Sequence, residues 1–383
     1  MNKKYDFDQI IPRRDTNSAK WKRYPNDVLP LWVADMDFPS PDEVVQALKV
    51  RAAHPCYGYG CDDEELRGVI CDWVELQYGW KIQPDWLLFV PGVVIGMNWA
   101  IQSQIEPGQK IGYQTPIYPP FLKFAGNAGA DEARIPLTES ADGYVIDFDQ
   151  FEHTIQDCSV FALCNPHNPA GRVFTPEELE QMAEICLKND VVICSDEIHC
   201  DLVYPGSRHI PIASLSSEIA SRAITLMAPS KTFNIPGLEF SFAIAPDADV
   251  RKKMEASRHG LVGHPSIFAY PAAKAAYMFG GDWLREVLGY LKANRDFLAD
   301  YLRQHFPRIG FSKPEGTYLA WLDCRELALG MDPYEFFLKQ AKVALNCGLD
   351  FGQEGNGFVR LNFATPRPML TEALERMKAS LAK

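Results

Sequence analysis

Short, uninterrupted runs of apolar residues recur through the middle of the chain and predict buried strands. The runs cover residues 86–90, 160–164, 191–194, 223–227 and 240–245. Strands that are continuously apolar, rather than alternating, are buried on both faces, which is typical of a largely parallel sheet covered by helices. The pattern therefore predicts a doubly wound α/β architecture for this part of the chain.

Helical patterns flank these runs. Residues 40–43, Ser-Pro-Asp-Glu, predict a capping box with proline at the first helical position, and residues 175–178, Thr-Pro-Glu-Glu, predict another helix start. Apolar residues follow each start at helical spacing, as in the stripe of Leu179, Met182 and Cys186. Both segments are therefore expected to be helices that pack on the sheet.

The last hundred residues have a different order of elements. The pattern there predicts a helix at 283–306, a strand at 318–322, a helix at 334–342, a strand at 358–363 and a terminal helix. This order is typical of an α+β unit, which we expect to pack on the larger domain together with the N-terminal arm. The predicted domains are an arm with part of the small domain (1–45), a large domain (46–280) and a C-terminal small domain (281–383).

Composition and charge exclude several classes of protein. Of the 383 residues, 47% are hydrophobic and 23% are charged, which is ordinary for a globular chain and argues against disorder. The formal net charge of −12 argues against nucleic acid as a partner, because binding to a phosphate backbone needs an excess of positive charge. No apolar run approaches the roughly 18–20 residues that a membrane span requires. We therefore expect neither a nucleic-acid nor a membrane partner.

The ten cysteines do not indicate a disulfide framework or a metal site. Cys164 and Cys194 lie inside apolar runs, where a thiol packs as a small hydrophobic group. Cys56 and Cys61 lie near His54, but no second Cys/His pair at ligand spacing completes a metal site. The chain has no secretory-type leader pattern either, so a reducing, cytoplasmic location is expected.

Two loops at the carboxyl ends of predicted strands carry groups suited to a polar ligand. The first passes through Gly92 into a helical pattern that begins at Val93 and Val94. Free backbone N–H groups at a helix start, together with the helix dipole, bind anions, although an ordinary strand-to-helix turn has the same pattern. The second loop, residues 165–171, is stiffened by prolines and presents the amide of Asn168.

Two further loops supply a carboxylate and an amine. Asp196 could pair with a cationic heterocycle, and His199 could reach a neighbouring phenolic oxygen; the alternative is a metal site, for which other ligands are missing. Lys231 follows the run 223–227, and a lysine at the end of a buried strand loses solvation. Lost solvation lowers the amine pKa and frees the amine to form a Schiff base, whereas a solvated surface lysine is the ordinary alternative.

Together the four loops match the needs of pyridoxal 5'-phosphate (PLP). Its phosphate needs N–H donors, and its phenolic oxygen needs hydrogen bonds. Its ring nitrogen needs a carboxylate to stay protonated, and its aldehyde needs an amine. No other common cofactor explains all four groups, so PLP is the predicted cofactor and no metal is expected.

Three motifs resemble a known family. Residues 168–171, 195–199 and 230–234 are similar to fold-type I PLP enzymes of the aminotransferase superfamily. More narrowly, they resemble the MalY/PatB branch of cystathionine β-lyases and cysteine C–S lyases, which includes cystalysin. Further similar stretches are 30–38, 57–59, 317–321 and 358–362. The resemblance covers nearly the whole chain and implies the aminotransferase-like fold, with a large PLP domain of mostly parallel sheet and a small α+β domain.

The resemblance implies a role for each matching residue around the cofactor ring. Lys231 would bind the aldehyde covalently and move the α-proton of the substrate. Asp196 would hold the ring N–H, while Asn168 and His199 would hydrogen-bond the phenolic oxygen. Tyr118 would stack on the ring.

Other residues are implied at the phosphate. Val93 and Val94 would donate backbone N–H groups, and Ser230 would add its hydroxyl. Tyr59 would reach the phosphate of the neighbouring subunit, which implies a homodimer with shared active sites.

The resemblance also implies how a small amino-acid substrate is held. Arg360 would bind its α-carboxylate through two hydrogen bonds, assisted by the backbone near Ala34. With Lys231 as the base, the implied catalytic set is Lys231, Tyr118 and Tyr59.

Three positions differ from the wider superfamily. Ala228 stands three residues before the lysine, where many members have serine, and Glu239 stands eight residues after it, where many have arginine. Phosphate binding must then depend on backbone amides and Tyr59. His199 stands where many aminotransferases have tyrosine, which fits the lyase branch.

The function implied by the resemblance is PLP-dependent β-elimination. L-cystathionine, L-cysteine or S-substituted cysteines would yield pyruvate, ammonia and a thiol. An aminotransferase of class I/II shares every cofactor contact and is the nearest alternative. A PLP-binding regulatory protein that acts through a protein partner is an alternative of another class.

Overall fold

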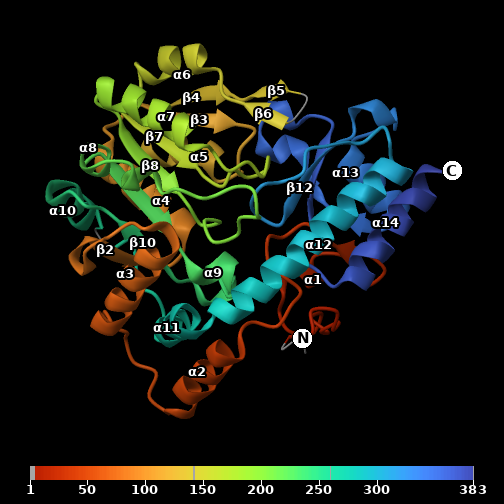
Figure 1. Ribbon diagram of the computed structural model, residues 1–383, viewed down its shortest axis with the longest axis horizontal. Coiled ribbons are helices and arrows are strands. Elements are labelled where there is room, and N and C mark those ends of the chain that lie inside the picture. Colours follow the sequence, from red (N-terminus) through yellow and green to blue (C-terminus); the bar gives the residue numbers. More distant parts are fainter. Residues whose placement is uncertain (1–4, 141–142, 259, 383) are drawn as a thin grey trace.

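A computed structural model describes residues 5–140, 143–258 and 260–382, and its largest element is a seven-stranded sheet (Figure 1). In spatial order the strands are β2 (Leu87–Val90), β10 (Ser241–Ile244), β9 (Ala223–Met227), β8 (Val192–Asp196), β7 (Val160–Cys164), β3 (Lys110–Thr115) and β4 (Asp131–Pro136). Neighbours from β9 to β4 pair in parallel, and β10 runs antiparallel to both β2 and β9. The predicted, mostly parallel α/β sheet is confirmed.

Three details of this sheet differ from the sequence prediction. The strands β3 and β4 lie outside the predicted set, because β3 contains polar residues and the edge strand β4 exposes most of its side chains. Strand β8 extends two residues beyond the predicted run, so Asp196 is the last residue of the strand rather than part of the following loop. Its side chain is therefore fixed by sheet pairing with Cys164 on one side and Leu226 on the other.

Helices cover both faces of the seven-stranded sheet. One face carries α4 (Val93–Gln104), α5 (Phe121–Ala128) and α10 (Ala248–Ser257); the other carries α3 (Glu64–Tyr78), α6 (Phe148–Ile155), α7 (Pro176–Lys188), α8 (Ser217–Ala220) and α11 (Ala269–Phe279). Successive residues of a strand point to opposite faces. In β8, Ile193 packs in one apolar cluster and Cys194 in the other, which explains why the strand is apolar throughout.

The C-terminal part forms a second, smaller sheet (Figure 1). Its antiparallel strands are β11 (Gly310–Phe311), β12 (Leu319–Asp323), β15 (Phe358–Asn362) and β14 (Asn346–Cys347). Its helices are α12 (Gly281–His305), α13 (Pro333–Phe336), which continues as a π-helical turn (Phe337–Ala341), and α14 (Arg367–Leu381). Figure 1 shows α12 running from beside α9 and α11 to this sheet.

The N-terminal arm joins this C-terminal part. Its strand β1 (Leu29–Pro30) pairs in parallel with β13 (Val343–Ala344). Apart from short 3₁₀ helices, the other described helices and strands are α1 (Ala19–Lys22), α2 (Asp42–Ala53), α9 (Pro229–Thr232) and the hairpin of β5 (Thr138–Ser140) and β6 (Gly143–Val145). We propose that residues 1–45 and 281–383 form one domain and 46–280 the other, which this strand pairing supports.

A capping box forms at the predicted helix start of residues 175–178, where the sequence indicates only a helix start. In α7, the Thr175 hydroxyl accepts from the Glu178 N–H, and the Glu178 carboxylate accepts from the Thr175 N–H. The box at residues 40–43 was wrong. Helix α2 begins at Asp42, and the Ser40 hydroxyl instead donates to the carbonyl oxygen of Asn234, 2.9 Å away. The Ser40 hydroxyl, which the local sequence predicted as a helix cap, therefore makes a tertiary hydrogen bond instead.

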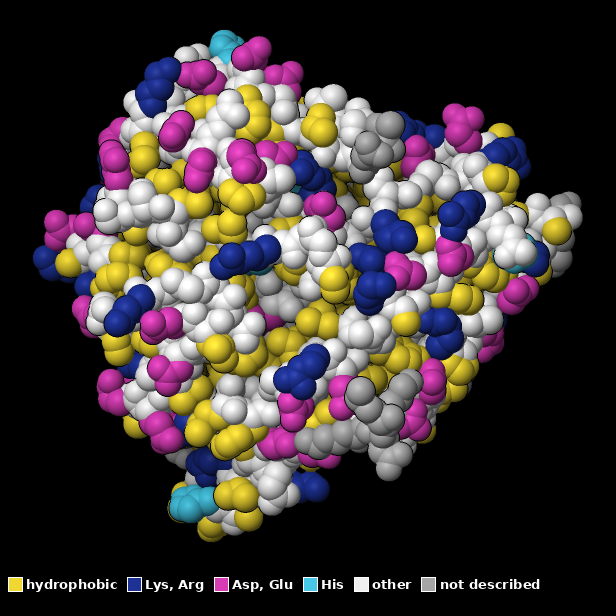
Figure 2. All heavy atoms as spheres, viewed as in Figure 1, with side chains coloured by type: hydrophobic (Ala, Val, Ile, Leu, Met, Phe, Trp, Pro, Cys, Tyr) yellow, Lys and Arg dark blue, Asp and Glu magenta, His cyan; other side chains and the backbone are white. Residues whose placement is uncertain are grey.

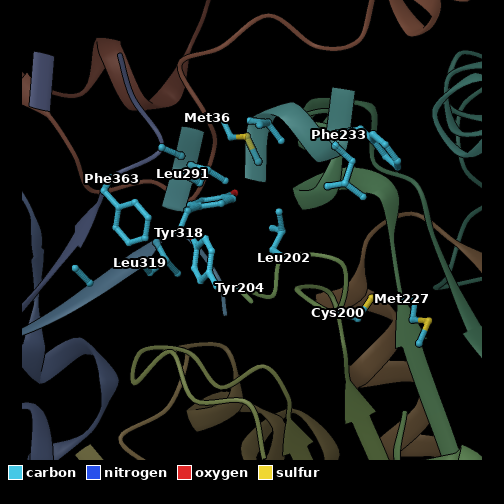
Figure 3. Close-up of a cluster of buried hydrophobic side chains, with 14 of the residues drawn as sticks. Met36, Cys200, Leu202, Tyr204, Met227, Phe233, Leu291, Tyr318, Leu319 and Phe363 are labelled. Carbon is cyan, nitrogen blue, oxygen red and sulfur yellow. The ribbon is translucent and has the colours of Figure 1, made fainter. Parts of the chain in front are cut away.

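A buried apolar cluster connects the arm, the large sheet and the C-terminal part (Figure 3). Met36 of the arm, Phe233 just after α9, Leu291 of α12 and Tyr318 just before β12 all belong to it. The N-terminal segment around Met36 is therefore held against the elements that carry Lys231.

The surface is of mixed charge. Figure 2 shows acidic and basic side chains interspersed over one face of the molecule. Within the described ranges, no helix is long and apolar enough to cross a bilayer, and no group of three or more His, Cys, Asp or Glu side chains is placed to hold a metal ion.

Candidate active site

A cavity of about 410 Å³ lies at the carboxyl ends of β7 and β8 and at the start of α4 and α9. Nine of the residues singled out in the sequence line it together: Ala34, Val93, Val94, Tyr118, Asn168, Asp196, His199, Ser230 and Lys231. Parallel strands end at the same edge of a sheet, so loops far apart in the sequence meet there. The structure therefore brings the four predicted loops to one site.

Lys231 lies in the short helix α9, directly after β9, and its amine points to the N-terminal arm. Its Nζ donates to the carbonyl oxygen of Ala34 at 2.6 Å. Burial lowers the pKa of Lys231 to about 8; the negative charges of Asp35 and Asp196 oppose this shift, and Arg360 adds to it. A substantial fraction of the amine is thus neutral and nucleophilic near physiological pH.

Asp196, at the end of β8, is a buried carboxyl that makes no ion pair with any residue the structure describes. Burial raises its pKa to about 7, and its oxygen Oδ1 accepts one hydrogen bond, from the N–H of Ile198 at 3.1 Å. The next residue fixes the segment, because the Glu197 carboxylate accepts from the Ser195 hydroxyl and lies 2.7 Å from His209 Nε2. A cationic ring nitrogen beside Asp196 would keep the carboxyl ionised and would itself stay protonated.

His199 and Asn168 present two groups that suit a ligand oxygen. The Nδ1 atom of His199 is buried and has no hydrogen-bond partner among the described residues. Burial, with the charges of Lys231 and Arg360, lowers the pKa of His199 well below its usual range, so the ring is neutral. The Asn168 Oδ1 accepts from Arg360 Nη1 at 2.9 Å, which leaves the NH₂ end of the amide to donate to a ligand.

The N-terminus of α4 opens on the same cavity. Gly92 precedes the helix with a φ of 98°, and no side chain caps the helix end. The first N–H groups of a helix have no intrahelical acceptor, so those of Val93 and Val94 remain for an anion. Glu239 also lines the cavity. Its exposed carboxylate adds negative charge at the position where many members of the wider superfamily have arginine.

Two predicted residues do not line the cavity. Arg360, on β15, is buried behind Asn168, and its Nη2 donates to the Asn346 side chain at 2.7 Å and to the Trp32 carbonyl at 3.2 Å. Its Nε is buried without a partner among the residues described. Tyr59 lies in the segment between α2 and α3 and is fully exposed. It contributes nothing to the cavity of its own chain.

Sequence reasoning missed three residues that hold the site in place. The Tyr318 hydroxyl donates to the Ala34 carbonyl at 2.9 Å, Asn346 orients Arg360, and the Asn362 side chain donates to the carbonyl oxygens of Val33 and Asp35. Tyr318 and Asn362 lie in stretches already noted for resemblance, which was the available signal. Asn346 lies in a two-residue strand with no pattern that could have marked it.

This donor set fits PLP. The open helix end suits its phosphate, and His199 Nδ1 and the Asn168 amide suit its phenolic oxygen. Buried Asp196 suits its ring nitrogen, and the Lys231 amine, with its lowered pKa, suits its aldehyde. An α/β fold with these groups at the carboxyl edge of its sheet defines a PLP-binding protein of fold type I.

The chain belongs to the aminotransferase class I and II family, whose model matches residues 26–377. It is 40% identical to the cystathionine beta-lyase PatB of Bacillus subtilis over 98% of this chain and 100% of that protein. Crystal structures of cystalysin from Treponema denticola, which contains PLP, and of the PLP-bound C–S lyase from Staphylococcus hominis superpose with TM-scores of 0.94 and 0.93. Their identities are 34% and 33%, and in each case 99% of both chains is covered.

The lowered pKa of Lys231 predicts how cofactor capture depends on pH. Only the neutral amine attacks an aldehyde, so the capture rate should rise as pH increases through about 8 and then level off. An unshifted lysine would still be gaining rate up to 10.5. The measurement is the rate at which visible absorbance appears when PLP is added to cofactor-free protein between pH 6.5 and 9.5. A parallel series with a free lysine derivative corrects for the ionisations of PLP itself.

The position of Glu239 predicts an effect on cofactor affinity. Glu239→Gln removes a negative charge from the cavity that we expect to receive the phosphate, so the dissociation constant of PLP should fall. Because the side chain is exposed, we expect a change of about threefold, the scale of an exposed charge interaction. Glu184→Gln, at an exposed position in α7, is the matched control, and equal affinities for the two variants would contradict the prediction.

Proposed function

We propose that the protein is a PLP-dependent carbon–sulfur β-lyase that converts L-cystathionine, L-cysteine or S-substituted cysteines to pyruvate, ammonia and a thiol. The observation that carries the proposal is the placement of Lys231. Its buried amine meets Asp196, Asn168 and His199 in one cavity, in a chain that is 40% identical along its whole length to a protein named cystathionine beta-lyase. The C–S lyase names of two further structural relatives support the same reaction.

Residues of the cavity and its surroundings would bind the cofactor and the substrate. PLP, when bound, supplies an electron sink that makes the α-hydrogen of an amino acid acidic. Asp196 would hold a proton on the ring nitrogen of PLP, and Tyr118, which lines the same cavity, would stack on the ring. Arg360 would bind the substrate carboxylate by exchanging its present contacts with Asn168, Asn346 and the Trp32 carbonyl, which would place the α-carbon beside Lys231.

Lys231 is then the group that moves the proton. With its amine free, Lys231 would take the α-proton of the substrate on Nζ. Loss of this proton allows the sulfur on the β-carbon to leave as a thiolate, which picks up a proton to become the thiol product. The Ala34 carbonyl, 2.6 Å from Nζ, accepts a hydrogen bond from the free amine and holds it at the site.

The test is pyruvate formation from L-cystathionine by protein saturated with PLP, without any added 2-oxo acid. Stoichiometric pyruvate, ammonia and thiol support β-elimination. A parallel panel of L-cysteine and S-alkyl cysteines identifies the preferred leaving group. Absence of pyruvate with every sulfur substrate would reject the proposal.

Transamination is the second candidate, and the family to which the chain belongs favours it. Aminotransferases share the cofactor contacts and differ in where the proton is returned. The same assay separates the two reactions, since an aminotransferase consumes substrate only when a 2-oxo acid acceptor is present.

We further propose a homodimer with shared active sites. The full exposure of Tyr59 and the half-exposed apolar side chains of Val94 and Ile95, at the rim of the cavity, support it, because a second copy could cover all three. Sedimentation equilibrium should give twice the 43.1 kDa chain mass, and a monomer would contradict the proposal.

A cytoplasmic location is also proposed. All ten cysteines are free thiols, which fits a reducing compartment. Fractionation of the source cells with an antibody to the protein tests this, and recovery outside the cytoplasmic fraction would contradict it.

A further inference from the structure

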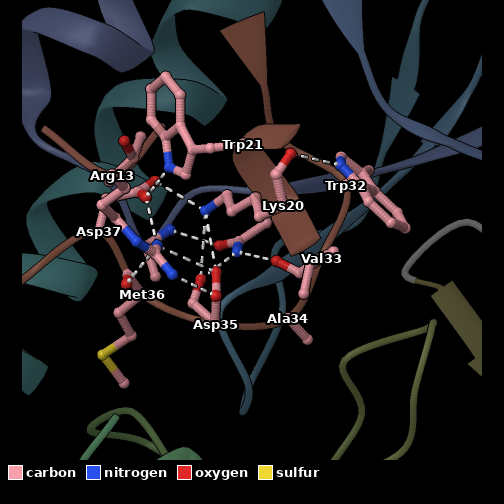
Figure 4. Close-up of polar contacts among 12 residues, drawn as sticks. Arg13, Lys20, Trp21, Trp32, Val33, Ala34, Asp35, Met36 and Asp37 are labelled. Carbon is pink, nitrogen blue, oxygen red and sulfur yellow. Dashed lines mark hydrogen bonds and ion pairs between the residues drawn. The ribbon is translucent and has the colours of Figure 1, made fainter. Parts of the chain in front are cut away.

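The N-terminal arm contains a buried ionic cluster that the proposed reaction does not explain (Figure 4). Lys20 Nζ lies 2.7 Å from Asp37 Oδ2, and Arg13 contacts Asp37 Oδ1 at 2.7 Å and Asp35 Oδ2 at 2.6 Å. The Trp21 indole N–H donates to the same Asp37 at 2.9 Å. The side chains of Lys20 and Asp37 are 0% and 4% exposed. Burying these charges is costly unless each is paired, as it is here.

The cluster fixes a short loop, residues 32–38. Besides its ion pairs, Arg13 donates to the backbone carbonyl of Met36 at 3.1 Å, and Lys20 donates to that of Asp35 at 3.3 Å. From the other side, Asn234 pairs with the backbone N–H and carbonyl of Met36. The loop is therefore held from the arm on one side and from the segment after Lys231 on the other.

The middle of this loop touches the catalytic lysine. The Ala34 carbonyl accepts from both Lys231 Nζ, at 2.6 Å, and the Tyr318 hydroxyl, at 2.9 Å. A neutral amine that gives one N–H to a carbonyl has its lone pair directed away from that oxygen. The loop thus determines the direction in which free Lys231 can accept a proton.

We propose that Arg13 and Lys20, by clamping Asp35 and Asp37, are positioning residues for proton transfer by Lys231. The clamp holds the Ala34 carbonyl where it orients the free amine toward the substrate's α-carbon, so that the α-proton passes to the Nζ lone pair. The proposal rests on the proposed lyase function for its effect on turnover. Its effect on the amine itself does not depend on which reaction is catalysed.

The clamp also sets the charge around the amine. The pKa of Lys231 is raised by the negative charges of Asp35 and Asp196 and lowered by the positive charge of Arg360. The same cavity is also lined by the neutral His199 and by the exposed carboxylate of Glu239. Because the negative charge of Asp35 stabilises the ammonium form, its removal should lower the pKa of Lys231 further below its present value of about 8.

Adjacent arginines offer a matched pair of variants. Arg14 also lies in the arm, but it donates to the carbonyl oxygens of Trp21, Tyr24, Asn26 and Val28. In the part of the chain that the structure describes, it makes no hydrogen bond or ion pair with the loop 32–38. In Arg13→Gln we expect kcat for pyruvate formation to fall about 10- to 100-fold, the scale of misplacing a catalytic group by about 1 Å, with KM changed by less than about threefold. In Arg14→Gln both constants should stay within about threefold of wild type.

A second measurement does not require turnover. In cofactor-free protein, the rate at which an amine-acylating reagent labels Lys231 is followed by mass spectrometry as a function of pH, with exposed Lys253 as the internal control. In Arg13→Gln the carboxylate of Asp35 loses its ion pair with Arg13, so the pKa of Lys231 should rise and labelling of Lys231 near neutral pH should slow, with labelling of Lys253 unchanged. The isosteric Asp35→Asn should instead lower the pKa of Lys231, while Asp35→Glu keeps it near the wild-type value.

The outcomes separate the two ideas. Equal kcat losses in Arg13→Gln and Arg14→Gln, or unchanged labelling of Lys231 in both Arg13→Gln and Asp35→Asn, would overturn the positioning role. If the wild type forms no pyruvate, the lyase function fails, and the labelling experiment still decides whether the clamp acts on Lys231. If Arg13→Gln does not fold, the Asp35 pair decides.

Discussion

Lys231→Ala is expected to abolish lyase activity, leaving less than about one thousandth of the wild-type kcat. The substitution removes both the amine that holds the cofactor and the base that takes the α-proton, and a positioned base alone contributes about 10²- to 10⁴-fold. The fold should persist, because among the described residues the Lys231 side chain donates a single hydrogen bond, to the Ala34 carbonyl, and little else is lost with it. The measurement is pyruvate formation, together with the visible absorbance of protein incubated with PLP and treated with borohydride.

Lys253→Ala is the control for this variant, since Lys253 is exposed on α10 and does not line the cavity. It should keep wild-type activity and colour. Substantial pyruvate formation by Lys231→Ala, or a borohydride-trapped cofactor on another lysine, would contradict the role assigned to Lys231. A thermal melt close to that of the wild type would exclude misfolding as the cause of the loss.

Asp196→Asn is expected to cause the second largest loss, about 10²- to 10³-fold in kcat. The amide keeps the shape of the side chain but cannot balance a protonated ring nitrogen, and removing one partner of a buried charge pair costs about 3–5 kcal/mol. Since burial already raises the pKa of Asp196 to about 7, the carboxyl depends on the ring cation to stay ionised. The measurements are kcat for pyruvate formation and the absorbance spectrum of the bound cofactor.

The sign of a stability effect distinguishes this carboxyl from an ordinary one. In cofactor-free protein the folded-state pKa of Asp196 is raised, so its contribution favours folding at low pH and is lost as pH rises through about 7. Asp196→Asn should remove this dependence, so that the stability gain of the variant over the wild type is larger at pH 8 than at pH 5 and disappears only below about 3.8, the ordinary pKa of the carboxyl. Asp249→Asn, at an exposed helix position, should change neither kcat nor the pH dependence.

Much of the fold followed from local pattern. The runs at 160–164 and 223–227 match β7 and β9 residue for residue, and α7 begins at the helix start predicted at residues 175–178. Strands buried on both faces must be apolar throughout, which makes them readable without any knowledge of their neighbours. The edge strand β4 has one largely exposed side and no such pattern, and for that reason it was missed.

The chemistry of the site was equally readable, because each of its groups lies where a strand ends. Parallel strands end at a common edge, so Asn168, Asp196 and Lys231 had to meet. The sequence alone thus determined the α/β class, the edge of the sheet that binds the cofactor and the kinds of group present there.

Tertiary structure decided what those groups contact. No local pattern could show that Arg360 would lie behind Asn168, or that the Ser40 hydroxyl would donate to the Asn234 carbonyl instead of capping a helix. Nor could a local pattern show that the Ala34 carbonyl would accept a hydrogen bond from the amine of Lys231, 197 residues away. Such contacts join segments whose spacing in the chain carries no periodic signal, and their energies depend on burial, which exists only once the domains are packed. The pKa values of Lys231 and Asp196 belong to the same category, since desolvation is the first cause of both shifts.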